Sequence, residues 1–188
     1  MAKAESLWVR ARRALSRAAA RRAARLEARK PRAAGRWLAL ACRLAPGFDF
    51  VHRDLSAHRR RLNDRLGALA AAQAAVRRFD RSAEAWMLLG EAFLGAFRPR
   101  DALAAYECAL TIEERADAAM AAGELYMRED DPVNAGARFA RAYAAGAGPK
   151  AIKANAEALQ AAGDLAAAAQ ARAMWEKETG QTWELSKK

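Results

Sequence analysis

A repeating interval of 33 or 34 residues constrains this chain more than any other feature of its sequence. The segment Trp86-x2-Leu89-Gly90-x2-Phe93 has a counterpart 33 residues later, Ala122-Gly123-x2-Tyr126. Small residues keep the same interval along most of the chain, and an alanine recurs at positions 34, 68, 102, 135 and 168. A fixed period of this length is typical of units that cannot bury their own apolar faces and therefore stack on their neighbours. The sequence thus predicts an array of about five stacked units.

The composition indicates that these units are helical. Hydrophobic residues make up 53% of the chain, and much of that share is alanine, the strongest helix former. Only five prolines and eleven glycines interrupt the chain. The strict alternation of Val, Ile and Thr that strands would need is missing. Because small side chains let helices approach closely, a layered all-α structure suits this composition.

These residues resemble the tetratricopeptide repeat, a helix–turn–helix unit of about 34 residues with the pattern W-x2-L-G-x2-Y followed by alanines in its second helix. The resemblance implies an all-α, right-handed α-solenoid over residues 15–180. The expected units are approximately 15–48, 49–82, 83–115, 116–148 and 149–180. Residues 1–14 are expected to form a basic helical extension, and residues 181–188 a C-terminal tail.

The first and last units depart from the repeat pattern. In the first unit, Arg21, Arg22 and Arg25 take the places of Leu, Gly and Tyr. A helix with arginines at these places cannot bury the usual face, so we expect it to be extended and partly exposed. In the last unit, Trp175 and Trp183 are expected to shield the open end of the stack, as terminal repeats require.

Catalytic and metal-binding patterns are missing from the sequence. The only histidines, His52 and His58, are six residues apart, so they face different sides of a helix. Cys42 and Cys108 have no metal-ligand spacing and are expected to be buried free thiols. No phosphate-binding loop or nucleophile elbow is present. We therefore expect no enzyme activity, no cofactor and no metal. Without an apolar segment for secretion or for a membrane span, a cytoplasmic protein is expected.

The resemblance also implies a binding groove, because the first helices of tetratricopeptide units line a concave face. The groove residues expected in the third and fourth units are Glu84, Met87, Glu91, Leu94, Asp117, Met120, Glu124 and Met127. Flexible methionine side chains accommodate imperfect ligands. A methionine-lined, acidic groove would suit a peptide segment with apolar and basic side chains.

The net charge of +11 comes entirely from the N-terminal half. Residues 1–81 contain 21 Lys or Arg and 6 Asp or Glu, whereas residues 82–188 contain 12 and 16. The basic residues that form one stripe or cluster are Arg10, Arg13, Arg17, Arg21, Arg25, Arg59, Arg60, Arg61 and Arg65. Such asymmetry indicates an anionic partner or surface for this half of the molecule.

The sequence therefore predicts a non-catalytic adaptor or scaffold. Its groove would hold a peptide segment of one partner protein, and its basic N-terminal half would dock on an acidic surface. Two alternatives stay open for the basic half. It could bind nucleic acid through its arginines, or its first helix could recruit the protein to an anionic membrane surface.

Overall fold

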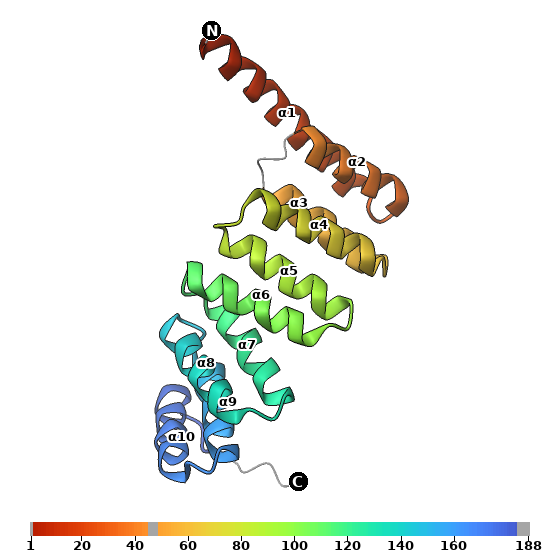
Figure 1. Ribbon diagram of the computed structural model, residues 1–188. Coiled ribbons are helices and arrows are strands. Elements are labelled where there is room, and N and C mark those ends of the chain that lie inside the picture. Colours follow the sequence, from red (N-terminus) through yellow and green to blue (C-terminus); the bar gives the residue numbers. More distant parts are fainter. Residues whose placement is uncertain (1, 45–48, 184–188) are drawn as a thin grey trace. The chain divides into compact units, whose positions relative to one another are not determined.

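The computed structural model describes the backbone of residues 2–44 and 49–183, and within these ranges it contains ten α-helices and no strand (Figure 1). The helices are α1 (Ala2–Leu26), α2 (Pro31–Leu44), α3 (Asp49–Arg61), α4 (Arg65–Arg78), α5 (Ala83–Gly95), α6 (Pro99–Ile112), α7 (Ala116–Arg128), α8 (Pro132–Ala144), α9 (Pro149–Ala161) and α10 (Leu165–Thr179). The all-α prediction is confirmed.

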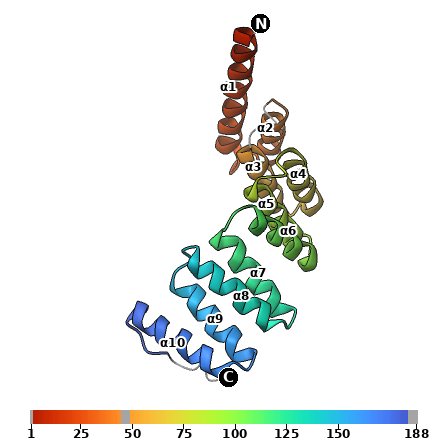
Figure 2. The same cartoon turned by 60° about the vertical axis from the view of Figure 1, so that its left-hand side comes forward.

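The chain forms two compact units. The N-terminal unit, Met1–Arg98, contains α1–α5, and the C-terminal unit, Pro99–Lys188, contains α6–α10. The division lies between α5 and α6, inside the third repeat that the sequence predicts at 83–115. Within each unit, consecutive helices pack on one another in layers, as α7–α10 do in Figure 2.

The periodic alanines lie in the buried contacts between helices. Each lies near the start of α2, α4, α6, α8 or α10. Ala34, Ala68, Ala102, Ala135 and Ala168 are all buried. A methyl group at these places lets a neighbouring helix approach, which a larger side chain would prevent. This requirement explains why the chain contains so much alanine and few large apolar residues.

Gly123 lies at a close contact between two helices of the C-terminal unit. A Cβ atom built on this residue would lie 2.5 Å from Cε1 of Phe139. Phe139 belongs to α8, the second helix of the same pair, and its ring is buried against Ala135 and Ala158. The glycine of the repeat pattern is therefore needed here because the aromatic ring occupies the space of its side chain.

Four of the five turns between paired helices share one backbone conformation. Asn63, Phe97, Asp130 and Gly163 all have positive φ angles between 58° and 83°. These residues are 33 or 34 positions apart, like the alanines. At three of the four turns an aspartate caps the next helix: Asp64, Asp131 and Asp164 each accept a hydrogen bond from the backbone N–H three residues later. The turn position is thus part of the repeat.

A buried histidine connects the first three helices of the N-terminal unit. The Nδ1 atom of His58 in α3 lies 3.0 Å from a carboxylate oxygen of Glu27, which follows α1. Arg61 donates to the same carboxylate. On its other side, the His58 ring lies so close to Gly35 of α2 that a Cβ there would be 3.0 Å from Nε2. His58 therefore serves the packing of α1, α2 and α3.

Candidate interaction surfaces

The glutamates expected to make the groove acidic are paired in the N-terminal unit. Arg53 lies 3.3 Å from Glu84, and Arg60 lies 2.8 Å from Glu91. Both pairs join α3 to α5, and all four side chains are partly exposed. Because each carboxylate faces a guanidinium, this part of the surface is close to neutral rather than acidic.

Leu94 borders a hollow of about 290 Å³ on the N-terminal unit. We name it the Phe97 hollow, and its lining residues are Arg60, Asn63, Arg65, Ala68, Ala92, Leu94, Gly95 and Phe97. The Phe97 ring is 73% exposed, and the Arg65 guanidinium lies 4.2 Å from its centroid. The sequence pattern identified Leu94 and Arg65 but not Phe97, because an aromatic residue gives no turn signal.

Met87 does not lie on an open surface. Its side chain is buried on α5, with 7% of the residue exposed. The expectation of an accessible methionine at this place is therefore corrected. The repeat pattern places Met87 next to the packing residues Trp86 and Gly90. In the structure, the side of α5 that carries Met87 is covered too.

On α7 of the C-terminal unit, the expected groove residues divide into two groups. Met120 and Met127 are half-buried and pack against the cluster of Ala135, Phe139 and Ala158, so these methionines contribute to the layer packing. Asp117 and Glu124 are exposed. A hydrogen bond from Arg115 lowers the pKa of the Asp117 carboxyl.

The arginine stripe of α1 is exposed from its first member to its last. The exposed residues are Arg10, Arg13, Arg17, Arg21 and Arg25. The side of α1 that packs against the rest of the unit carries Ser16, Ala19 and Ala23, all buried. At 100° per residue, the stripe is centred well over 90° from this packed side. Its guanidinium groups therefore face solvent.

The second basic cluster is engaged within the N-terminal unit. Arg59 donates to the carbonyl oxygen of Gly67 at 2.7 Å. Arg60 and Arg61 face Glu91 and Glu27, while Arg65 donates to Asn63 and covers the Phe97 ring. These four arginines thus connect α3 and α4 to neighbouring residues.

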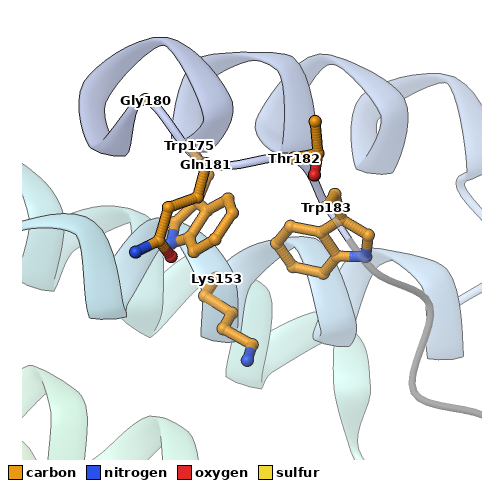
Figure 3. A pocket seen from close by; sticks show the side chains of 6 residues that line it. All are labelled: Lys153, Trp175, Gly180, Gln181, Thr182 and Trp183. Atoms are coloured by element: carbon orange, nitrogen blue, oxygen red, sulfur yellow. The ribbon is translucent and has the colours of Figure 1, made fainter.

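Two indole rings lie in contact in the last layer of the C-terminal unit. The Trp175 and Trp183 rings meet edge to face with centroids 5.3 Å apart, and both pack against Ile152, Ala156 and Ala171. Figure 3 shows these rings and Lys153 around a hollow of about 520 Å³. Lys153 and Arg172 each lie within 6 Å of the Trp183 ring. The two tryptophans cover the last layer, as expected of a cap.

In the part of the chain that the structure describes, no group of three His, Cys, Asp or Glu residues is arranged to hold a metal ion. Each described helix is also too short or too polar to cross a membrane. Both cysteines are free: Cys42 is buried, and Cys108 is half-buried.

No protein-family model and no curated protein matches this chain in sequence. Solved structures do match it. The MamA protein superposes with a TM-score of 0.73 at 16% identity, over 93% of this chain and 98% of MamA. PilF of Pseudomonas aeruginosa gives 0.71 at 18%, over 92% and 80% of the two chains. A thermophilic TPR protein of Thermus thermophilus gives 0.61 at 21%, over 88% and 92%. With the helix pairs, buried alanines and repeated turns, this similarity shows that the chain has the helical solenoid fold of tetratricopeptide-repeat proteins.

Proposed function

We propose that this protein is a non-catalytic adaptor. It would bind a peptide segment of a partner protein on the first helices of its repeats, and dock on an acidic partner with its basic N-terminal half. The observation that carries the proposal is the Phe97 hollow, where an exposed aromatic ring stands beside Leu94 in a conformation that phenylalanine rarely adopts. A left-handed backbone costs a residue with a Cβ about 1 kcal/mol or more.

The position of Phe97 supports a binding role rather than a folding role. The equivalent turns use Asn63, Asp130 and Gly163, which tolerate this backbone conformation better. The ring of Phe97 also gains little from burial, since most of it is exposed. Strained residues persist where function maintains them. An apolar peptide side chain placed between Leu94 and Phe97 would bury both.

Charge would contribute to specificity more than to affinity. At Glu84 and Glu91, a basic peptide side chain would compete with Arg53 and Arg60. On the C-terminal unit, taken by itself, the exposed Glu124 of α7 would attract a basic side chain of a peptide bound there. Surface ion pairs add little net free energy, so we expect apolar contacts to determine affinity.

Selection from a displayed random-peptide library tests the peptide site. Peptides selected on the wild-type protein should contain an aliphatic or aromatic residue, and calorimetry should show that Phe97→Asn and Leu94→Ala weaken their binding. Phe97→Asn is the sharper variant because the same turn conformation holds Asn63, so a loss of binding would not result from unfolding. The control is Val133→Ala, which removes an exposed apolar side chain from α8. Peptides that bind both variants as tightly as wild type would contradict this site.

The basic half needs a separate test. Replacing Arg10, Arg13, Arg17 and Arg21 with Gln should keep the helix, because glutamine is also a good helix former. It should remove salt-sensitive binding to an acidic protein such as polyglutamate. Titrations with RNA, duplex DNA and phosphatidylserine vesicles distinguish the alternatives. If none of these anions binds the wild-type protein at low salt, the docking role of the basic half is wrong.

A further inference from the structure

The first helical pair of the N-terminal unit exposes large apolar residues on one side. Trp8 and Leu15 of α1 are 67% and 56% exposed, and Trp37 and Leu40 of α2 are 37% and 38% exposed. We name these four residues the open apolar face. In Figures 1 and 2, the N-terminal half of α1 extends past the end of α2. Accordingly, Arg12 reaches the last carbonyl group of α2, at Leu44.

On α2, the open apolar face points away from the third helix. The thiol of Cys42 donates to the Val51 carbonyl of α3, and at 100° per residue Trp37 and Leu40 lie about 140–160° around α2 from Cys42. On α1, Leu15 lies about 80–100° from the buried residues Ser16 and Ala23 and is itself exposed. Trp8 and Leu15 therefore lie beside the buried side of α1 and are left open. A preceding repeat would pack on this side.

The adjoining, buried side of the same pair has the packing of an ordinary layer. The cluster there contains Ala19 and Ala23 of α1, Leu38 and Ala41 of α2, and Leu55 of α3, all buried. The last layer of the C-terminal unit, in contrast, is covered by Trp175 and Trp183. The first layer thus has apolar side chains where a further helix would fit and no segment among the described residues that covers them.

The charges around the open apolar face indicate which kind of helix would bind there. Residues 8–44 contain twelve Lys or Arg and a single acidic residue, Glu27, and Glu27 is already bonded to His58 and Arg61. Arg22 follows Trp8 and Leu15 at intervals of seven residues, so it continues their line along α1. Arg36 and Arg43 lie four and three residues from Leu40, on the adjoining side of α2. The face is therefore apolar in its centre and bordered by arginines.

We propose that the open apolar face binds an acidic amphipathic helix of a partner protein, which packs on α1 and α2 as an additional layer. This inference rests on the proposed docking of the basic half and specifies the occupant. Leucine-like residues of the partner would cover Leu15 and Trp37, and its Asp or Glu side chains would meet Arg22 and Arg36. The same face of a second copy is excluded as the occupant because it would bring two strongly basic surfaces together.

The length of the face defines a probe. Trp8 and Arg22 are fourteen residues apart, so the line they mark on α1 is about 21 Å long. A helical peptide of about 18 residues spans this length. The probe is a fluorescein-labelled synthetic peptide with leucine on one side and glutamate on the other. One control peptide has the same composition in scrambled order, and a second has lysine in place of glutamate.

Fluorescence anisotropy with the full-length protein tests the proposal. The acidic amphipathic peptide should bind, the scrambled peptide should bind at least about tenfold more weakly, and the lysine peptide should not bind. The double change Leu15→Ala and Trp37→Ala should weaken binding about tenfold or more and leave the salt dependence unchanged. Arg22→Gln with Arg36→Gln should weaken binding and flatten the salt dependence. The matched control, Arg77→Gln with Arg78→Gln, changes two exposed arginines of α4, outside both this face and the α1 stripe, and should have the smaller effect.

Other outcomes would overturn the inference. If the scrambled peptide binds as tightly as the amphipathic one, or if the Leu15 and Trp37 changes have no effect, docking is purely electrostatic. The proposed docking of the basic half would then survive while this inference fails. RNA or phosphatidylserine vesicles that bind more tightly than the peptide, and lose binding with the same apolar changes, would assign the face to another class of ligand. Circular dichroism of each variant checks that its helices are retained.

Discussion

The contact between Gly123 and Phe139 allows a prediction in which two identical substitutions have opposite effects. A Cβ at Gly123 would lie 2.5, 2.7 and 2.9 Å from three carbon atoms of the Phe139 ring, whereas carbon atoms normally pack at about 3.5–4.0 Å. The ring must therefore move by about 1 Å. Because it is 3% exposed and held against Ala158, we expect an overpacking cost of about 1–3 kcal/mol for Gly123→Ala.

Gly136 is the matched control because it also lies within a helix of the C-terminal unit. Its added Cβ would meet Asn155 at 3.4 Å and Ala158 at 3.8 Å, which are ordinary contacts. Alanine is better than glycine in a helix by about 1 kcal/mol, so Gly136→Ala should stabilise the protein by up to about that amount. Both variants gain the same helix propensity. The difference between them, about 1–3 kcal/mol in favour of Gly136→Ala, therefore measures packing alone.

Urea unfolding followed by circular dichroism gives the comparison. Adding Phe139→Leu to Gly123→Ala should reduce the cost of the glycine change, since the colliding ring atoms are then gone, and a double-mutant cycle measures this coupling. Equal unfolding midpoints for Gly123→Ala and Gly136→Ala would show that the Phe139 ring is not held where the structure has it, and the packing argument would be refuted.

Three further predictions concern the N-terminal unit. Phe97→Asn should raise the free energy of unfolding by about 1 kcal/mol, because asparagine adopts the left-handed conformation more readily; an unchanged urea midpoint would show that no strain is relieved. Burial raises the pKa of the Cys42 thiol to about 11, so maleimide should label the less buried Cys108 first at about pH 8. Stability should also fall as the pH rises from about 9 towards 11, more steeply in wild type than in Cys42→Ala. Hydrogen bonds from His58 and Arg61 lower the pKa of the Glu27 carboxyl. The ionised carboxylate therefore stabilises the folded protein above the ordinary carboxyl pKa, and this stabilisation is lost as the pH falls through the lowered pKa. The melting temperature of Glu27→Gln should depend less on acid pH than that of wild type.

The fold was predictable because close helix packing requires small residues, and these recur at fixed intervals in the sequence. Ala102, Ala135 and Gly123 must be small wherever helices touch, whatever surrounds them, so the interval alone reveals the layers. The surface was less predictable. Neighbouring positions on a helix differ by about 100°, and whether the side chain of Met87 is covered depends on the residues of adjoining layers. No interval in the sequence encodes that.

The arginines illustrate the same limit. The arginines of the α1 stripe and those at 59–65 are alike in sequence, and nothing in the pattern shows that Arg60 and Arg61 meet carboxylates from other parts of the chain. Glu27 and Glu91, for example, are each more than 30 residues from the arginine that binds them. Phe97 was not predicted for another reason. Its positive φ becomes apparent only when its turn is compared in three dimensions with the equivalent turns at Asn63, Asp130 and Gly163.

Several ion pairs join residues about one repeat apart. Arg53 and Glu84, Arg60 and Glu91, and Arg138 and Glu107 are each separated by 31 residues and connect corresponding helices of successive repeats. In a linear array, cooperativity depends on coupling between nearest neighbours rather than on the stability of each repeat. Because part of this coupling is ionic and partly exposed, salt screens it. Added salt should thus broaden the unfolding transition of each unit before it lowers the helix content, and the terminal layers should fray first. Ionic strength would then control how many repeats unfold together.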